Sequence, residues 1–270
     1  ISKGGLGQKE LGVVIAPTGA GKSMVLVHLG TQALKAGKTV VHYTLELQDT
    51  VIASRYDSCL TKVPLGNLMS FKEKIYEEVQ GIEGRLIVKE YPTKSATTHT
   101  IKTHLEKLKM RNIDVDMIIV DYADLLRPVR TQREKRNELE TIYEELRGIA
   151  AEVKCPIWTA SQTNRSGLNA EVITMEAISE AFNKCFVSDF IFTVSRTVDD
   201  KVANGGRVFV AKNRNGPDGL VFPIFMDTST VSIKVLEPSE EDENVEVNAK
   251  KQKQSLAEKY KNFKKNKGEN

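Results

Sequence analysis

Short apolar runs alternate along this chain with longer segments in which apolar residues recur at helical spacing. Strands are expected at residues 11–15, 39–45, 85–91, 115–121, 155–161 and 190–195. Helical spacing marks residues 24–34, 50–60, 71–79, 100–110 and 137–153. Because strands and helices alternate, we expect an α/β fold with a mainly parallel, twisted sheet flanked by helices. Later runs at 208–211 and 220–225 predict a C-terminal β-hairpin, and 231–236 is a last strand candidate.

The same pattern divides the chain into three parts. Residues 1–10 contain three glycines and two lysines and are typical of a linker or flexible lead-in. Residues 11–236 carry the predicted strands and helices and are expected to form one domain. Residues 237–270 begin with an acidic run and continue rich in lysine, which predicts a disordered or marginally helical tail. We expect it to be solubilising, and contact with a partner or nucleic acid is the alternative. Because the sequence starts with Ile1, we expect a further segment to precede it.

Composition narrows the class of protein. A chain of 270 residues with 40% hydrophobic content can bury a full core, and its net charge of +3 permits contact with nucleic acid without indicating it. Its three cysteines are scattered, so neither a disulfide framework nor a zinc site is expected. The apolar runs fall short of the roughly 18 residues that cross a bilayer. We therefore expect a soluble cytoplasmic protein with no membrane partner.

A turn of small residues joins the first apolar run to the first helix. It reads Ala16, Pro17, Thr18, Gly19, Ala20, Gly21, Lys22 and Ser23, and Met24 follows it in the helix. Glycines let backbone N–H groups surround a polyphosphate, and the helix directs its positive end at the same anion. This strand, turn and helix predict a phosphate loop that binds a polyphosphate, although Ala16 occupies the position where the usual pattern has glycine.

Other side chains in the pattern suit the same chemistry. Lys22 can reach the β and γ phosphates, and the Ser23 hydroxyl suits Mg²⁺. Asp121 ends a buried strand, where a carboxylate can hold the same ion through water. Glu46 also follows a strand and is placed to polarise a water for attack on the γ phosphate, although a solvated loop glutamate is the alternative. Gln162 ends a further strand, where its amide can sense the γ phosphate.

Several cations fall outside these motifs. Arg55, on the helix predicted at 50–60, is a further candidate for nucleotide binding. Arg130, Arg133 and Arg136 belong to a basic cluster that either contacts a phosphate backbone or is a solvated surface. The stretch at 211–217 carries two cations two residues apart before a Gly-Pro turn, and a solvated basic turn is the alternative reading there.

Taken in order, these motifs resemble the ATPase domain of DnaB-type replicative hexameric DNA helicases, most closely the bacteriophage versions. The phosphate loop at 16–23, the segment at 44–47, the strand at 119–122 with Leu125, the stretch at 161–165 and the stretch at 211–217 carry the resemblance. It spans residues 11–236 and implies a RecA-like P-loop NTPase core in a bacterial or phage-infected cell.

The resemblance also implies roles. Glu46 would be the catalytic glutamate and Gln162 the γ-phosphate sensor, while Lys212 and Arg214 would reach the nucleotide of the neighbouring subunit. ATP and Mg²⁺ would be the cofactors, and ATP would be hydrolysed between the subunits of a homohexameric ring that travels along single-stranded DNA and unwinds the duplex. The family's DNA-binding loops would fall near 127–136 and 164–184, which adds Arg165 and Lys184 as candidates.

The sequence departs from the family's pattern in two respects, and two alternative functions stay open. Residues 178–184 preserve only part of the family's loop pattern, and the family's N-terminal domain, which helps to build the ring and to meet primase, has no counterpart in this sequence. Primase and a helicase loader are expected partners of the family. A strand-exchange ATPase of the RecA and RadA type would form a filament on DNA instead of a ring, and a KaiC-like ATPase would not bind DNA.

Overall fold

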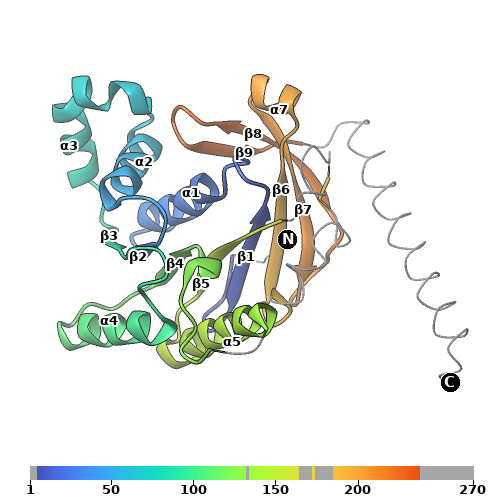
Figure 1. Ribbon diagram of the computed structural model, residues 1–270. Coiled ribbons are helices and arrows are strands. Elements are labelled where there is room, and N and C mark those ends of the chain that lie inside the picture. Colours follow the sequence, from blue (N-terminus) through green and yellow to red (C-terminus); the bar gives the residue numbers. More distant parts are fainter. Residues whose placement is uncertain (1–4, 132–133, 164–171, 174–184, 238–270) are drawn as a thin grey trace, which may run out of the picture.

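A single nine-stranded sheet forms the centre of the computed structural model, which describes residues 5–131, 134–163, 172–173 and 185–237. Its strand order is β3-β2-β4-β5-β1-β6-β7-β8-β9 (Figure 1). The strands are β1 (Leu11–Ala16), β2 (Thr39–Thr44), β3 (Arg85–Glu90), β4 (Met117–Asp121), β5 (Ile157–Gln162), β6 (Phe190–Ser195), β7 (Gly205–Asn213), β8 (Val221–Asp227) and β9 (Ser232–Val235).

The first six strands run parallel to one another, and β7, β8 and β9 continue the sheet in antiparallel pairs. The predictions of a mainly parallel sheet and of a C-terminal hairpin are therefore confirmed, and β9 adds one more antiparallel strand. The expected division at residues 10 and 236 stays a prediction, because residues 1–4 and 238–270 lie outside the described part of the chain.

Helices cover both faces of the sheet. They are α1 (Lys22–Lys35), α2 (Asp49–Thr61), α3 (Lys72–Gln80), α4 (Thr98–Met110), α5 (Lys135–Val153) and α7 (Val198–Val202), with the 3₁₀ helices η1 (Leu65–Phe71) and η2 (Ala123–Leu125). Figure 1 shows α1 and α2 on one side of the sheet and α4 and α5 on the other. Among the described helices, none is both long enough and apolar enough to cross a bilayer.

Strand β1 lies near the centre of the sheet, where helices cover both faces, and it is apolar along its whole length. All six residues of β1 are buried, and successive side chains alternate between the two faces. Val13 and Ile15 join the core that contains α4 and α5, whereas Val14 and Ala16 join the core that contains α1 and α2. The strand is thus fixed from both sides, which holds the loop that follows it.

Gly12 in β1 leaves room for the ring of Trp158 on the neighbouring strand. A Cβ atom at Gly12 would lie 2.6 Å from ring atoms of Trp158, which is closer than two carbon atoms can approach. The ring itself is nearly buried and packs edge-on against Phe190 and Phe192 of β6. Any side chain at residue 12 would therefore have to displace a tightly packed aromatic group.

We predict that Gly12→Ala lowers the free energy of unfolding by about 1–3 kcal/mol, the usual cost of overpacking a core. Urea denaturation followed by circular dichroism measures this. The matched control is Gly148→Ala, on the exposed face of α5 with no atom within 4 Å of the added methyl group. That change removes a helical glycine and should leave stability equal or higher. Equal stability of the two variants would contradict the packing argument.

Candidate nucleotide-binding site

The loop between β1 and α1 adopts a backbone that only glycine accommodates easily. Gly19 and Gly21 have φ angles of 72° and 97°, in the left-handed region, and Gly21 is the residue that caps α1. A Cβ atom at Gly21 would also lie 3.0 Å from Sδ of Met226. The N-terminus of α1 therefore opens directly into the loop, where its unpaired N–H groups can bind an anion.

Lys22 begins α1, and its side chain reaches back across the loop. Its Nζ donates to the carbonyl oxygens of Ala16 at 3.3 Å and Pro17 at 3.1 Å. Burial lowers the pKa of Lys22, and the negative charges of Glu46 and Asp121 oppose that effect. A phosphate in the loop would oppose it further, because a nearby anion favours the charged form of the amine.

Asp121 ends β4 in register with Thr44 of β2 and has 1% of its surface exposed. Burial raises its pKa to about 6, and a hydrogen bond from the Ser23 hydroxyl partly counters the shift. Its Oδ1 has no hydrogen-bond partner in the described part of the chain. A buried carboxylate with an unused oxygen beside a serine hydroxyl fits Mg²⁺ held partly through water.

The described residues include no group of three or more His, Cys, Asp and Glu side chains that could hold a metal ion. That finding agrees with the chemistry of Mg²⁺, which binds few protein ligands and takes the rest from water and phosphate. Ser23 and Asp121 are the residues that would hold that ion.

Glu46 is exposed at the same edge of the sheet, in a turn that follows β2. The turn is anchored from both sides, because Thr44 Oγ1 donates to the Leu47 carbonyl at 2.7 Å and Thr93 Oγ1 donates to the Leu45 carbonyl at 2.7 Å. The charge of Glu46 helps to raise the pKa of Asp121 and of Tyr122. The carboxylate is thus electrostatically coupled to the loop while remaining open to water.

Gln162 lies beside the phosphate loop because β5 pairs with β1. The register sets Gln162 opposite Ala16, and its Nε2 donates to Thr18 Oγ1 at 2.6 Å. The Gln162 amide thus joins the end of β5 to the phosphate loop that follows β1. Arg55 reaches the same place from α2, where burial lowers its pKa and the charges of Asp121 and Glu46 oppose that effect.

These side chains surround one pocket of about 300 Å³ at the carboxyl ends of the parallel strands. Its lining residues are Thr18, Gly19, Gly21, Lys22, Ser23, Met24, Glu46, Leu47, Arg55, Tyr122, Gln162, Arg196 and Thr228. Most of the nucleotide-binding and catalytic candidates from the sequence are therefore brought together. Such a crevice is the usual ligand site of an open α/β sheet.

The sequence reading missed Arg196 and Thr228 in this pocket. Arg196 directly follows β6, is 8% exposed and donates from Nε to the Gly205 carbonyl at 2.8 Å. A cation just after a buried parallel strand is a signal that could have identified it, since β6 ends at the same edge as β1. Thr228 lies between β8 and β9, and its neighbours in the sequence give no such signal.

Lys212 and Arg214 lie at the opposite edge of the sheet. Because β7 runs antiparallel to β6, the end of β7 at Asn213 pairs with Phe190 at the start of β6, which in turn pairs with Gly12 of β1. The phosphate loop leaves the other end of β1, after Ala16. The two cations are therefore not brought to the phosphate loop of their own chain.

The candidates for DNA contact are only partly described. Arg130 and Arg136 are exposed, the first between η2 and α5 and the second in the first turn of α5. Arg133, Arg165 and Lys184 lie outside the described residues.

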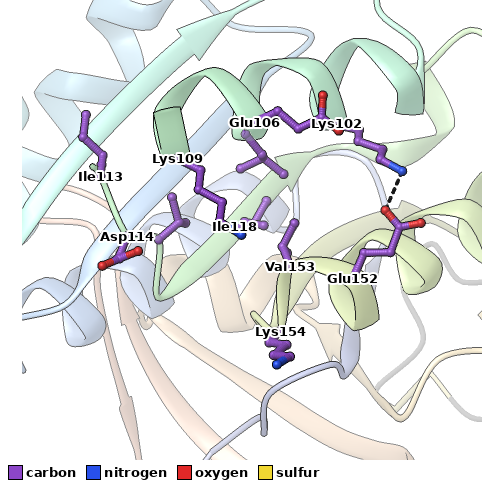
Figure 2. Close-up of a pocket in the computed structure, with 11 residues that line it drawn as sticks. Lys102, Glu106, Lys109, Ile113, Asp114, Ile118, Glu152, Val153 and Lys154 are labelled. Atoms are coloured by element: carbon purple, nitrogen blue, oxygen red, sulfur yellow. Dashed lines mark ion pairs between the residues drawn. The ribbon is translucent and has the colours of Figure 1, made fainter. Parts of the chain in front are cut away.

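A larger pocket, of about 390 Å³, lies between α4 and α5 (Figure 2). An ion pair of 2.6 Å joins Lys102 and Glu152 there, and charges of both signs line its rim. It lies beside Ile113 and Val115, which precede β4, and so at the edge of the sheet away from the phosphate loop. It lacks a glycine-rich turn and a helix N-terminus aimed into it, so the smaller pocket is the better nucleotide site.

The fold and the site define the chain as a P-loop nucleoside-triphosphate-binding protein with a RecA-like core. Comparison with known proteins identifies its family: the description "DnaB-like helicase C terminal domain" matches residues 2–231. The chain therefore belongs to the DnaB-like helicase C-terminal domain family, as its motifs predicted.

Individual relatives agree. The chain is 29% identical over 260 residues to the DnaB-like replicative helicase of Enterobacteria phage T4, covering 92% of this chain and 55% of that protein. It is 25% identical over 256 residues to the replicative DNA helicase DnaB of Mycoplasma genitalium, covering 87% of this chain and 54% of that protein. The chain thus spans about half the length of these relatives.

Solved structures support the fold. One of them, described as an ATPase domain, superposes with a TM-score of 0.75 at 16% identity, covering 87% of this chain and 88% of that one. A structure of a DnaB-like replicative helicase and its interactions with primase gives a TM-score of 0.74 at 16% identity, covering 86% and 59% of the two chains. The prediction of a RecA-like core is confirmed.

We predict that Asp121→Asn stabilises the protein at pH 8 in EDTA and without nucleotide, by about 1–3 kcal/mol of unfolding free energy. The folded-state pKa of about 6 exceeds the ordinary 3.8, so the buried carboxylate destabilises the wild-type fold above pH 6. This penalty fades as the pH falls from about 6 towards 3.8, because the wild-type group is then protonated in the folded state. Urea denaturation at pH 8 and pH 4.5 compares the full penalty with the smaller one that remains near pH 4.5. If Asp121→Asn were less stable than wild type at pH 8, the buried Asp121 carboxylate would not destabilise the fold as argued.

Proposed function

We propose that this chain is the ATP-hydrolysing motor of a replicative DNA helicase. Its subunits form a homomeric ring, hydrolyse ATP at the interfaces between them and move along single-stranded DNA to unwind the duplex. The observation that carries the proposal is the separation of the two halves of the site. Each chain has a complete phosphate loop at one edge of its sheet and, at the opposite edge, two cations that its own nucleotide cannot use.

The separation follows from strand geometry. Gly12 and Ala16 are four residues apart, which is roughly 13 Å along a strand, and Arg214 lies beyond the Gly12 end. We call Arg214 a finger because it would reach into the neighbour's site. Contact between the end of the sheet that carries Lys212 and Arg214 and the phosphate-loop end of the next subunit is head-to-tail, and such contacts close into rings when the rotation permits. Lys212 and Arg214 would then complete the site of the neighbour.

The side chains predicted from the sequence around the phosphate loop have distinct roles in this mechanism. The loop amides and Lys22 bind the β and γ phosphates, and Ser23 with Asp121 would hold Mg²⁺. That ion, when bound, neutralises charge on the phosphate oxygens. Glu46 orients and polarises the attacking water, and Gln162 contacts the γ phosphate from the tip of β5. Arg214 of the neighbouring subunit stabilises the charge that develops in the transition state, a contribution of about 10³ to 10⁵ in rate.

The DNA would pass along basic loops. Arg130 and Arg136 are exposed cations before and within the first turn of α5, and we propose Arg133, Arg165 and Lys184 as further phosphate contacts. Contacts to phosphates do not read the base sequence, as a motor that moves along any strand requires. We also propose primase and a helicase loader as partners of the whole protein. One structural neighbour is described with its primase interactions.

We predict that Lys22→Ala abolishes ATP hydrolysis, and that Arg214→Ala binds nucleotide normally but loses at least about 10³ in turnover. Co-assembly of the two inactive variants should restore activity. The intact phosphate loop of the Arg214→Ala subunit then meets Arg214 from the Lys22→Ala subunit at about a quarter of the interfaces of a random ring. Steady-state ATPase assays on each variant and on the mixture measure this. Normal turnover by Arg214→Ala, or a mixture as inactive as its parts, would reject the shared site.

We also predict that the ATPase rate per subunit rises with protein concentration and rises again when single-stranded DNA is added. Assembly completes the sites, and DNA favours the assembled state. The affinity for the DNA should fall steeply with salt, because phosphate contacts release counterions. A flat rate that ignores DNA would favour a self-contained ATPase of the KaiC type. Electron microscopy with ATP and DNA separates the ring from the filament expected of a strand-exchange protein.

A further inference from the structure

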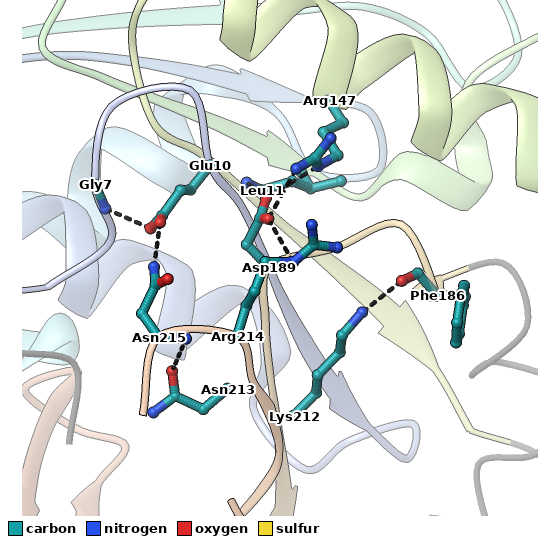
Figure 3. Close-up of polar contacts among 10 residues, drawn as sticks. All are labelled: Gly7, Glu10, Leu11, Arg147, Phe186, Asp189, Lys212, Asn213, Arg214 and Asn215. Carbon is teal, nitrogen blue, oxygen red and sulfur yellow. Dashed lines mark hydrogen bonds and ion pairs between the residues drawn. The ribbon is translucent and has the colours of Figure 1, made fainter. Parts of the chain in front are cut away.

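Asp189 is a buried carboxylate at the edge of the sheet opposite the phosphate loop. It directly precedes β6 and is 4% exposed. Two arginines from distant parts of the chain meet on it, Arg147 of α5 and Arg214 after β7 (Figure 3). The sequence pattern gave no role to Asp189 or to Arg147, and the mechanism above uses neither of them.

The two arginines contact the carboxylate in different ways. Arg147 binds both oxygens, from Nε to Oδ2 at 3.1 Å and from Nη2 to Oδ1 at 3.0 Å. Oδ2 also accepts the backbone N–H of Leu11 at 3.1 Å. Arg214 makes only an ion pair through Nε, 3.1 Å from Oδ1, while its backbone N–H donates to the Asp189 carbonyl at 2.9 Å.

The outer end of Arg214 is consequently left for another contact. No bond from its two terminal amino groups to the described residues is present, and 49% of the side chain is exposed. In Figure 3 these groups point away from the carboxylate. A guanidinium has five N–H donors in a planar fork, so one edge can bind a carboxylate while the other binds a phosphate.

The charge of the cluster also suits a phosphate. Arg147 and Arg214 share a single carboxylate, which leaves one positive charge in excess. Lys212 lies beside them, with Nζ 4.8 Å from the ring centre of Phe186. Burial lowers the pKa of Lys212, and the charge of Arg214 lowers it further. An incoming polyphosphate would relieve this crowding of like charges.

We propose that Asp189 is the positioning residue of the Arg214 finger. Its carboxylate holds the Nε edge of the guanidinium so that the terminal amino groups project towards the γ phosphate of the neighbouring subunit. Arg147 and the Leu11 N–H make three of the four contacts to the carboxylate, so Arg214 is oriented without being fully neutralised. The inference rests on the proposed function, because it assumes that Arg214 acts in a neighbour's site.

The central test is Asp189→Asn in the full chain. Asparagine has the same shape and can still accept the Leu11 N–H, but it lacks the charge that aligns Arg214. We expect kcat for ATP to fall about 10- to 100-fold, with KM and nucleotide affinity unchanged, because the finger acts in the transition state. The double variant Asp189→Asn with Arg214→Ala should have the kcat of Arg214→Ala alone.

Asp116→Asn is the matched control. Asp116 precedes β4, accepts the backbone N–H of Thr39 at 2.9 Å and pairs with Lys38 at 3.4 Å. Like Asp189, it therefore binds the N–H of a strand residue and a cation, but it does not contact Arg214. It should leave kcat unchanged. Thermal melting of each variant shows whether a lost activity reflects lost folding.

The outcomes separate the two proposals. Normal turnover by Arg214→Ala rejects the shared site of the proposed function. An inactive Arg214→Ala with a fully active Asp189→Asn rejects the positioning role alone, as does a double variant whose losses multiply. If Asp189→Asn does not fold, Arg214→Lys replaces it, since lysine keeps the charge but has no Nε edge to bind Asp189. If the turnover of Arg214→Lys falls to that of Arg214→Ala, the result supports a guanidinium that binds Asp189 with one edge and phosphate with the other. Full turnover by Arg214→Lys overturns this contact.

Discussion

Strand direction is the constraint on which the rest of this structure depends. The six parallel strands all end at one edge of the sheet, which brings the phosphate loop, Glu46, Asp121 and Gln162 together although they are distant in the sequence. The reversal of direction at β7 sends Arg214 to the other edge. A side chain cannot cross the length of a strand, so Arg214 cannot reach the phosphate loop of its own chain. In the proposed function, the two ends of the sheet would form one site only when a second copy is present.

Two buried carboxylates mark these two edges, and their surroundings explain their different chemistry. Asp189 is bonded by a backbone N–H and a bidentate arginine, so its charge is compensated within the chain. Asp121 has one hydrogen bond, from Ser23, and one oxygen without a partner among the described residues, and burial raises its pKa to about 6. An uncompensated buried acid is costly unless a ligand satisfies it. The first carboxylate is therefore suited to hold a side chain and the second to receive a cation.

Much of the fold could be predicted because its signals are local. Buried strands such as Phe190–Ser195 are continuous apolar runs, and the phosphate loop is a contiguous stretch whose backbone needs dictate its residues. The short helices η1, η2 and α7 were missed, since their sequences lack a full period of apolar positions. Arg196 and Asp189 were missed for another reason: each is a single charged residue at a strand end, and only the strand order reveals what it meets.

The two edges are joined by one short rigid element. Leu11 and Asp189 exchange hydrogen bonds, from the Leu11 N–H to the carboxylate and from the Asp189 N–H to the Leu11 carbonyl at 2.9 Å. From Leu11, the fully buried β1 runs straight to Ala16 and the phosphate loop. Close-packed interiors deform little, so we expect Arg214 and the phosphate loop of one chain to move as one body. If one subunit of the proposed ring rotated, two adjacent sites would therefore change at once. Its Arg214 would move relative to the nucleotide of one neighbour, and its own nucleotide would move relative to the Arg214 of the other neighbour.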